Sequence, residues 1–98
     1  MTEFSNDQLQ EIERLAAAAF TPKETAFILG ISPGTFKSLI ADEESAVSIA
    51  YYKGLYSSEL AIRESAFLLA RSGSSPAQTL ALKYFEQTKS KILIDEQN

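Results

Sequence analysis

Cysteine and histidine are both absent from this sequence of 98 residues. Without them the chain has no disulfides, no thiol nucleophile, no imidazole acid–base chemistry and no zinc-finger ligands. Long apolar runs are also missing, since none approaches the roughly 20 residues that cross a bilayer. The first residues, MTEFSNDQ, are acidic and polar, unlike a signal peptide. We therefore expect a cytoplasmic protein that makes no membrane contact.

Signals of catalysis are equally scarce. The four glycines, at positions 30, 34, 54 and 73, are scattered and form no phosphate-binding loop. The acidic residues stand where solvated helix faces and helix caps predict them, and no pocket can be read around a pair of carboxylates. We expect a non-enzymatic protein with no catalytic residue, no metal site and no cofactor.

Basic residues are fewer than acidic ones in this sequence. The formal net charge is −4, and residues 1–42 carry three basic residues against six acidic ones. DNA-binding proteins usually gain much of their affinity by neutralising phosphates. Any contact of this half with DNA is therefore expected to be weak for each subunit.

What the sequence does contain is helical periodicity. Apolar residues recur at helical spacing in five segments, which predicts an all-α fold. Ser5 and Gln8 form a capping-box pattern before the first helix. The apolar face of that helix is predicted to comprise Leu9, Ile12, Leu15, Ala16 and Ala19.

The segment TPKETAFILGISPGTF, residues 21–36, predicts two short helices and a tight turn. Thr21–Pro22 and Ser32–Pro33 are helix-opening pairs, and Gly30 is a helix stop. Ala26 and Gly30 are expected to let the two helices cross closely, while Phe20 and Phe27 are expected in the core. We predict a helix-turn-helix DNA-binding unit over residues 1–42, although the corner of a helical bundle can use the same pattern.

The third helix, which ends near Ala41 and Asp42, would present a polar face. The predicted DNA-binding residues are Thr21, Lys23, Ser32, Gly34, Thr35, Lys37 and Ser38. This set contains no Arg, Asn or Gln for a bidentate contact to a base edge. We expect these residues to contact the sugar–phosphate backbone of double-stranded DNA, with little sequence preference. A face that instead meets protein is the alternative.

Residues 43–98 are predicted to form a long antiparallel αα-hairpin that serves oligomerisation. A helix beginning at Asp42 or in the following EESA would run to about Arg71, with a kink or break near Gly54. In RSGSSP, Gly73 would end that helix, and Ser75–Pro76 with Gln78 would cap a helix over about 76–93. The final DEQN is expected to be a frayed tail.

The hairpin carries more apolar surface than two helices can bury against each other. We therefore expect a homo-oligomer. Tyrosine suits such an interface because its ring is apolar and its tip is polar. The predicted oligomerisation residues are Tyr51, Tyr52, Tyr56, Leu60, Phe67 and Tyr84.

This order of segments resembles the small subunit of tailed-phage terminases. The likeness covers roughly residues 8–92 and rests on TPKETAFILGISPGTF, AYYKG, LAIRESAFLLARSGSSPA and LKYF. It implies a non-enzymatic subunit of a phage or prophage DNA-packaging complex. Such a subunit binds viral DNA through its helix-turn-helix and assembles through its hairpin. A large terminase subunit is a further expected partner, although little sequence remains beyond Ile94 for that contact.

Two alternative interpretations stay open. A small dimeric helix-turn-helix transcriptional regulator would place two recognition helices about 34 Å apart on a palindromic site. A protein-interaction adaptor of a mobile element would not bind DNA at all. A packaging subunit would instead form a ring of many copies, and the ring would gain affinity for DNA from the number of its subunits.

Overall fold

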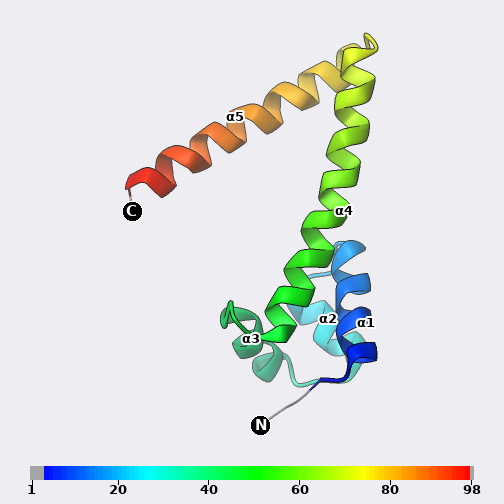
Figure 1. The fold of residues 1–98 in the computed structure, drawn as a ribbon, viewed down its shortest axis with the longest axis vertical. Coiled ribbons are helices and arrows are strands. Elements are labelled where there is room, and N and C mark those ends of the chain that lie inside the picture. The colour runs from blue at the N-terminus through cyan, green and yellow to red at the C-terminus, as the bar shows by residue number, and fades with distance from the viewer. Residues whose placement is uncertain (1–3, 98) are drawn as a thin grey trace. The chain divides into compact units, whose positions relative to one another are not determined.

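The computed structural model describes residues 4–97, with side chains described for 4–96, and these residues form five α-helices and no strand (Figure 1). The helices are α1 (Asn6–Ala17), α2 (Pro22–Leu29), α3 (Pro33–Ala41), α4 (Ala46–Arg71) and α5 (Ser75–Gln97). The predicted all-α fold is confirmed, and three short helices followed by two long ones are compatible with the predicted three-helix unit and hairpin. Across the described residues, no helix combines the length and apolar character that a bilayer crossing requires.

Local capping signals set the starts of the first three helices. Ser5 Oγ accepts a hydrogen bond from the Gln8 backbone N–H at 3.2 Å, and Gln8 Oε1 accepts one from the Ser5 N–H at 2.8 Å. Thr21 and Glu24 form the same reciprocal pair before α2. Ser32 caps α3 through a longer contact of 3.5 Å. These starts lie where the sequence places them because each cap depends on residues only three positions apart.

The turn between α2 and α3 depends on the backbone of Gly30. Gly30 has φ +74°, and the N–H of Ile31 reaches back to the carbonyl of Ala26 at 2.9 Å. A methyl group on Gly30 would meet no atom within 4 Å. The glycine is therefore needed for its left-handed conformation and not for space, so the expected steric role of Gly30 was wrong. Ala26, which is fully buried, occupies the close packing position instead.

The end of α1 differs from the prediction. The helix stops at Ala17, and Ala19 has φ +69°. The N–H of Phe20 donates to the carbonyl of Leu15 at 3.2 Å, which is the pattern that glycine usually supports after a helix. Ala19 is consequently exposed, and its predicted place on the apolar face of α1 was wrong.

The core of the N-terminal unit draws on four helices. Its buried members are Ile12, Ala16, Ala26, Phe36, Ile40, Val47 and Tyr51. Leu29, Ile31 and Leu39 are partly buried and pack against it. Phe20 and Phe27, however, were expected in the core and are exposed, Phe27 to 64 %. The buried residues of α2 are Thr25 and Ala26, so Phe27 is turned away from the core.

Gly54 lies inside a continuous α4, so the helix does not break there. A methyl group at this position would overlap the backbone of Glu13 in α1. The glycine therefore permits α1 and α4 to touch backbone to backbone. Beside this contact, Lys53 Nζ lies 3.6 Å from a carboxylate oxygen of Glu13.

The chain divides into two compact units at residues 59 and 60 and not at the expected position after residue 42. The reason is that the first turns of α4 supply Val47 and Tyr51 to the core of the N-terminal unit. α4 begins only at Ala46, after the acidic residues 42–44, and Ser45 caps it by accepting the Ser48 N–H at 3.0 Å.

The C-terminal unit consists of residues 60–71 of α4, a short turn and α5. Gly73, with φ +104°, ends α4 as predicted. The cap of α5 is Ser74 and not Ser75, since Ser74 Oγ accepts from the Ala77 N–H at 3.4 Å. α5 continues through Gln97, so the expected frayed DEQN tail is helical as far as the structure describes it.

Candidate nucleic-acid interface

The start of α2 and the outward face of α3 carry all seven predicted DNA-binding residues, and all seven are exposed. Four of them surround one shallow depression of about 410 Å³. The depression is lined by Thr21, Pro22, Lys23, Pro33, Gly34 and Lys37. The tight turn at Gly30 thus brings the starts of two helices to one surface.

The hydroxyl groups at this surface differ in whether their protons are free to donate a hydrogen bond to an anion. Thr21 and Ser32 use their oxygens to accept backbone N–H groups, so their hydroxyl protons remain available. Ser38 instead donates its proton to the carbonyl of Gly34 at 3.2 Å. Thr35 is exposed beside them on α3. Among the hydroxyl groups of the predicted set, those of Thr21, Ser32 and Thr35 are therefore better placed than that of Ser38 to donate to a phosphate.

The charge at this depression is positive although the chain is acidic. Lys23 and Lys37 line it, and none of the described residues that line it is acidic. The carboxylate of Glu24 is held at the cap of α2 by the Thr21 N–H at 2.9 Å. The N-terminal ends of α2 and α3 add partial positive charge. The surface can accept a phosphate group but has no side chain suited to bidentate reading of a base.

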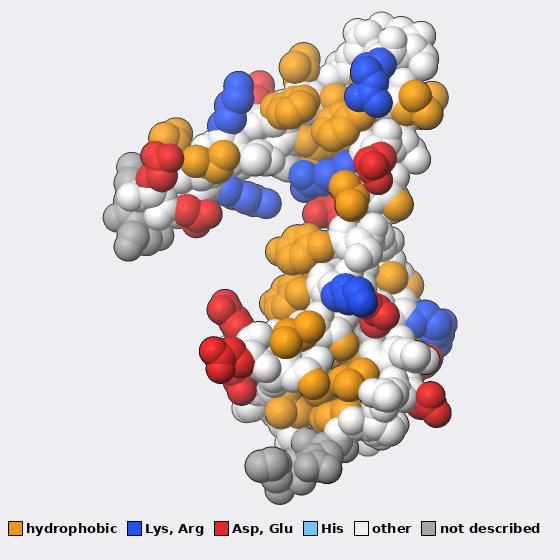
Figure 2. Space-filling model, viewed as in Figure 1, with side chains coloured by type: hydrophobic (Ala, Val, Ile, Leu, Met, Phe, Trp, Pro, Cys, Tyr) orange, Lys and Arg blue, Asp and Glu red, His pale blue; other side chains and the backbone are white. Residues whose placement is uncertain are grey.

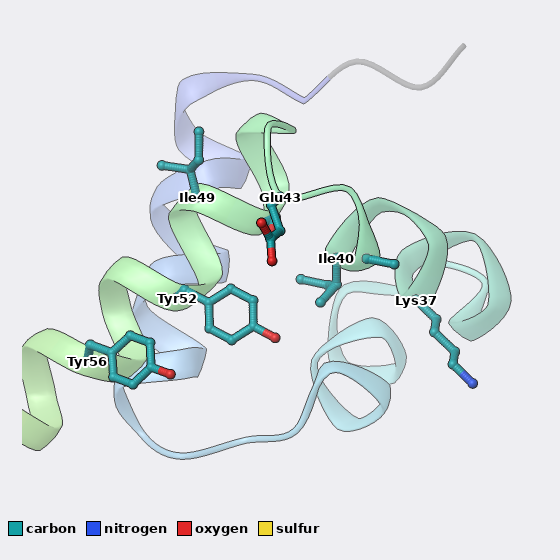
Figure 3. A pocket seen from close by; sticks show the side chains of 8 residues that line it. Lys37, Ile40, Glu43, Ile49, Tyr52 and Tyr56 are labelled. Carbon is teal, nitrogen blue, oxygen red and sulfur yellow. The ribbon is translucent and has the colours of Figure 1, made fainter. Parts of the chain in front are cut away.

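A second surface adjoins α3, and we call it the aromatic groove. It has a volume of about 680 Å³ and is lined by Lys37, Ile40, Ala41, Glu43, Ser48, Ile49, Tyr52 and Tyr56. In Figure 3, Ile40, Glu43 and Tyr52 point toward one another, whereas Lys37 extends away. The rings of Tyr52 and Tyr56 stack with centroids 6.0 Å apart.

Tyr52 and Tyr56, two predicted oligomerisation residues, are brought together in the aromatic groove. Ile49 lies on the same stripe of α4 at helical spacing, which is a signal readable from the sequence. Glu43 carries no such signal, because its position depends on the turn between α3 and α4.

Tyr51 does not belong with the other predicted oligomerisation residues. Its side chain is buried in the core, and its hydroxyl donates to the carbonyl of Phe20 at 2.6 Å. Burial raises the pKa of the Tyr51 hydroxyl, and the charges of Tyr52 and Glu24 raise it further. Its assignment to an association surface was therefore wrong, because a core side chain cannot meet a partner without unfolding.

The remaining three predicted residues, Leu60, Phe67 and Tyr84, lie in the C-terminal unit. Phe67 packs edge-on to Tyr84, with centroids 6.1 Å apart, and stacks on Phe85 at 5.5 Å. The guanidinium carbon of Arg63 stands 4.3 Å above the Tyr84 ring. Phe67 and Tyr84 are thus half-buried between the two helices, whereas Leu60 is exposed.

Large apolar side chains cover the C-terminal unit, and Figure 2 shows hydrophobic surface over both of its helices. Among its described residues, the buried apolar ones are only Ala66, Ala77 and Ala81. Its exposed large apolar residues are Leu60, Ile62, Leu68, Leu69, Leu80, Leu82, Phe85, Ile92, Leu93 and Ile94. A surface of this kind is typical of a helical pair that packs against another protein.

No group of three or more metal-ligating side chains comes together within the described part of the chain. No protein-family model, curated protein or solved structure matches this chain.

Proposed function

We propose that this chain is a non-enzymatic DNA-binding subunit of a phage or prophage DNA-packaging (terminase) complex. In this proposal α3 and the start of α2 bind the DNA backbone, and the C-terminal hairpin joins copies of the chain. A large terminase subunit would be the protein partner.

The observation that carries the DNA-binding part is the depression between the two helix starts. It combines Lys23 and Lys37 with the available hydroxyl of Thr21, and Ser32, which precedes the lining residue Pro33, adds a second hydroxyl at the start of α3. Groups of this kind bind phosphate and carry little sequence information. α3 is a separate helix with an exposed outward face, which is the geometry that helix-turn-helix binding requires.

Self-association is supported by the composition of the hairpin. Among its described residues, the fully buried apolar side chains are alanines, and Phe67 and Tyr84 are only half-buried, so the two helices gain little hydrophobic stabilisation from each other. Association of several copies would cover the larger side chains. It would also offset the weak binding of one acidic subunit, because linked sites act at a high effective concentration.

The packaging role itself rests on the resemblance of the segments TPKETAFILGISPGTF, AYYKG and LAIRESAFLLARSGSSPA to terminase small subunits. The absence of base-reading side chains on α3 disfavours a sequence-specific dimeric regulator. An experiment can distinguish a protein-interaction adaptor from the proposed DNA-binding subunit, because the adaptor would not bind DNA at any salt concentration.

The test is binding of a fluorescent duplex at low salt to the wild-type chain, Lys37→Glu and Lys83→Glu. Lys83 is an exposed residue of α5, so this control alters net charge equally without touching α3. We expect Lys37→Glu to weaken binding by about tenfold, as loss of a phosphate contact and an added repulsion predict. Equal affinities for Lys37→Glu and Lys83→Glu would contradict the proposed face, and the absence of wild-type binding would contradict DNA binding altogether.

A further inference from the structure

The aromatic groove is an apolar surface that stays exposed within the N-terminal unit. Ile49 and Tyr56 line it and are exposed to 57 % and 60 %. Ile40 also lines the groove but is buried and belongs to the core, so the floor of the groove is the core itself. Exposed aromatic side chains gathered in a groove are typical of a surface that binds another protein.

The shape of the groove suits a helix. One wall is the end of α3, and the other is the stripe Ile49, Tyr52 and Tyr56 on α4. These three side chains follow one another at steps of three and four residues, which is the spacing over which helices pack together. Both walls are helices, whose backbone groups bond internally, so the groove offers no strand edge to an extended peptide.

Hydrogen bonds in the turn between α3 and α4 hold the two walls in place. The Ser45 hydroxyl donates to the carbonyl of Leu39 at 2.6 Å and accepts the Ser48 N–H at 3.0 Å. The Glu44 N–H donates to the carboxylate of Asp42 at 3.1 Å. These bonds fix the turn beside the groove. A groove that is already formed spares a partner the free-energy cost of shaping it.

Negative charge borders the groove. Glu43 lines it, and the sequence neighbours Asp42 and Glu44 are exposed on the same turn. Lys37 also lines the groove, but Figure 3 shows its side chain extending away from Ile40 and Glu43. Complementary charge around an apolar contact determines which partner is accepted. A partner with lysine or arginine beside its apolar residues would therefore match this border.

The tyrosine rings favour the same kind of partner. Tyr52 and Tyr56 stack with their centroids 6.0 Å apart, and both are exposed. A lysine or arginine side chain is attracted to the face of an aromatic ring, and its aliphatic part packs against the ring. Nucleic acid or an anionic membrane surface is disfavoured, because the acidic residues 42–44 repel it. The groove thus favours an apolar surface that carries positive charge.

Another copy of this chain lacks the required charge. Contact between two grooves would bring residues 42–44 of both copies together, and like charges repel. α5 exposes several large apolar residues, but it carries three lysines and three acidic residues and so has no excess of positive charge. The occupant that matches the groove is consequently a helix of another protein.

We infer that the aromatic groove is the docking site of a basic amphipathic helix from another protein. That helix has an apolar stripe that packs on Ile49, Tyr52 and Tyr56, and lysine or arginine beside the stripe that pairs with residues 42–44. The inference goes beyond the proposed function, because it depends neither on DNA binding by α3 nor on association of the hairpin.

The test uses a synthetic peptide as its probe. The peptide has about 18 residues, enough to form a helix in water, with leucine along one face and lysine on the flanks. One of its leucines is replaced by tryptophan. Because this chain contains no tryptophan, the emission of the probe reports its own transfer from water into the groove. A matched peptide has glutamate in place of every lysine, and each is titrated with the full chain at about 0.15 M salt.

Exposed residues inside and outside the groove provide the variants and their controls. Ile49→Ser should weaken binding of the basic peptide by about tenfold, because it removes an apolar contact. Ile28→Ser is the matched control, since Ile28 is 52 % exposed on α2 and does not line the groove. Glu43→Lys should weaken binding by about fivefold. Its control is Glu86→Lys in α5, which changes the net charge equally. We expect both controls to bind within about twofold of the wild type.

Tighter binding of the basic peptide than of the acidic one, with losses confined to Ile49→Ser and Glu43→Lys, supports the docking. Failure of the basic peptide to bind at up to about 1 mM would overturn it, as would equal effects of a variant and its control. A loss caused by Leu82→Ser and not by Ile49→Ser would place the peptide on the exposed apolar surface of the hairpin and also overturn it.

Light scattering of the same variants identifies a second copy in the groove. If the wild-type chain self-associates and Ile49→Ser abolishes that association, a copy of the chain fills the groove and the inference is wrong. An association that Ile49→Ser leaves unchanged, together with its loss of peptide binding, supports a separate partner. Failure of the peptide to bind leaves the proposed DNA binding and hairpin association to their own tests.

Discussion

At the scale of single residues, the conformation of Ala19 and the burial of Tyr51 have the clearest consequences. Ala19 occupies a left-handed backbone position after α1, where an L-residue with a Cβ is strained. Tyr51 connects α4 to the segment after α1 through its hydrogen bond to the Phe20 carbonyl. Neither feature can be inferred from the neighbouring sequence, and each makes a prediction that can be measured.

Ala19→Gly should stabilise the protein. Glycine adopts φ +69° without strain, so we expect the free energy of unfolding to rise by about 0.5–1 kcal/mol. Ala17→Gly is the matched control, because Ala17 is the exposed last residue of α1, where glycine should lower the stability by up to about 1 kcal/mol. Urea denaturation of the two variants measures both changes. A loss of stability in Ala19→Gly would contradict the assigned backbone.

Tyr51 should make the protein sensitive to alkali. Because burial raises the pKa of its hydroxyl above the ordinary value of about 10, the folded state holds the proton more tightly than the unfolded state. The resulting stability is intact below about pH 10 and falls as pH rises through the raised pKa. Tyr51→Phe should lower stability at pH 7 by about 1 kcal/mol through the lost hydrogen bond, and it should remove this alkaline decline. Denaturation curves from pH 7 to about 11 compare the two proteins. Identical pH profiles would refute the role of Tyr51.

At the scale of elements, the contact between α1 and α4 fixes the N-terminal unit. Gly54 leaves no room for a side chain against the Glu13 backbone. The contact positions α4 so that Val47 and Tyr51 reach the core. It also sets where the α4 side of the aromatic groove lies.

Gly54→Ala should therefore be strongly destabilising, by about 2–3 kcal/mol or more, because overpacking forces backbone movement. Gly34→Ala is the control. An added methyl group there would lie no closer than 3.9 Å to Ser32 Oγ, so the better helix propensity of alanine should raise stability slightly. Thermal unfolding compares the variants. A Gly54→Ala protein as stable as the wild type would show that the helices are not in backbone contact.

Elements whose limits depend on adjacent residues could be predicted from the sequence. The pairs Ser5–Gln8 and Thr21–Glu24, and the stop at Gly30, are local patterns with one physical meaning. The features that the sequence predicts wrongly depend on tertiary packing. From the sequence alone, Gly54 is expected to interrupt a helix, because its contact with α1 is not visible there. Phe27 is expected in the core, because the sequence does not show which side of α2 faces the core. The seven predicted DNA-binding residues are exposed as expected, because on α3 their spacing already separates them from Phe36 and Ile40.

At the scale of the whole molecule, the acidic net charge and the proposed DNA binding have to be reconciled. The chain places Lys23 and Lys37 at one depression beside the starts of α2 and α3, and it places Asp42, Glu43 and Glu44 after α3. A single copy thus offers few phosphate contacts. The proposed association through the C-terminal hairpin would add copies and so multiply the phosphate contacts. DNA affinity and self-association should consequently rise together as protein concentration increases.

The measurement that tests DNA binding by α3 most directly is the salt dependence of duplex affinity, for the wild-type chain and for Lys23→Glu/Lys37→Glu. Each lysine that neutralises a phosphate contributes about 0.9 to the slope of log K against log salt concentration. We predict measurable wild-type binding at low salt and a slope reduced by about two for each bound subunit in the variant. Absence of wild-type binding at the lowest salt concentration, or an unchanged slope in the variant, would contradict DNA binding through this surface.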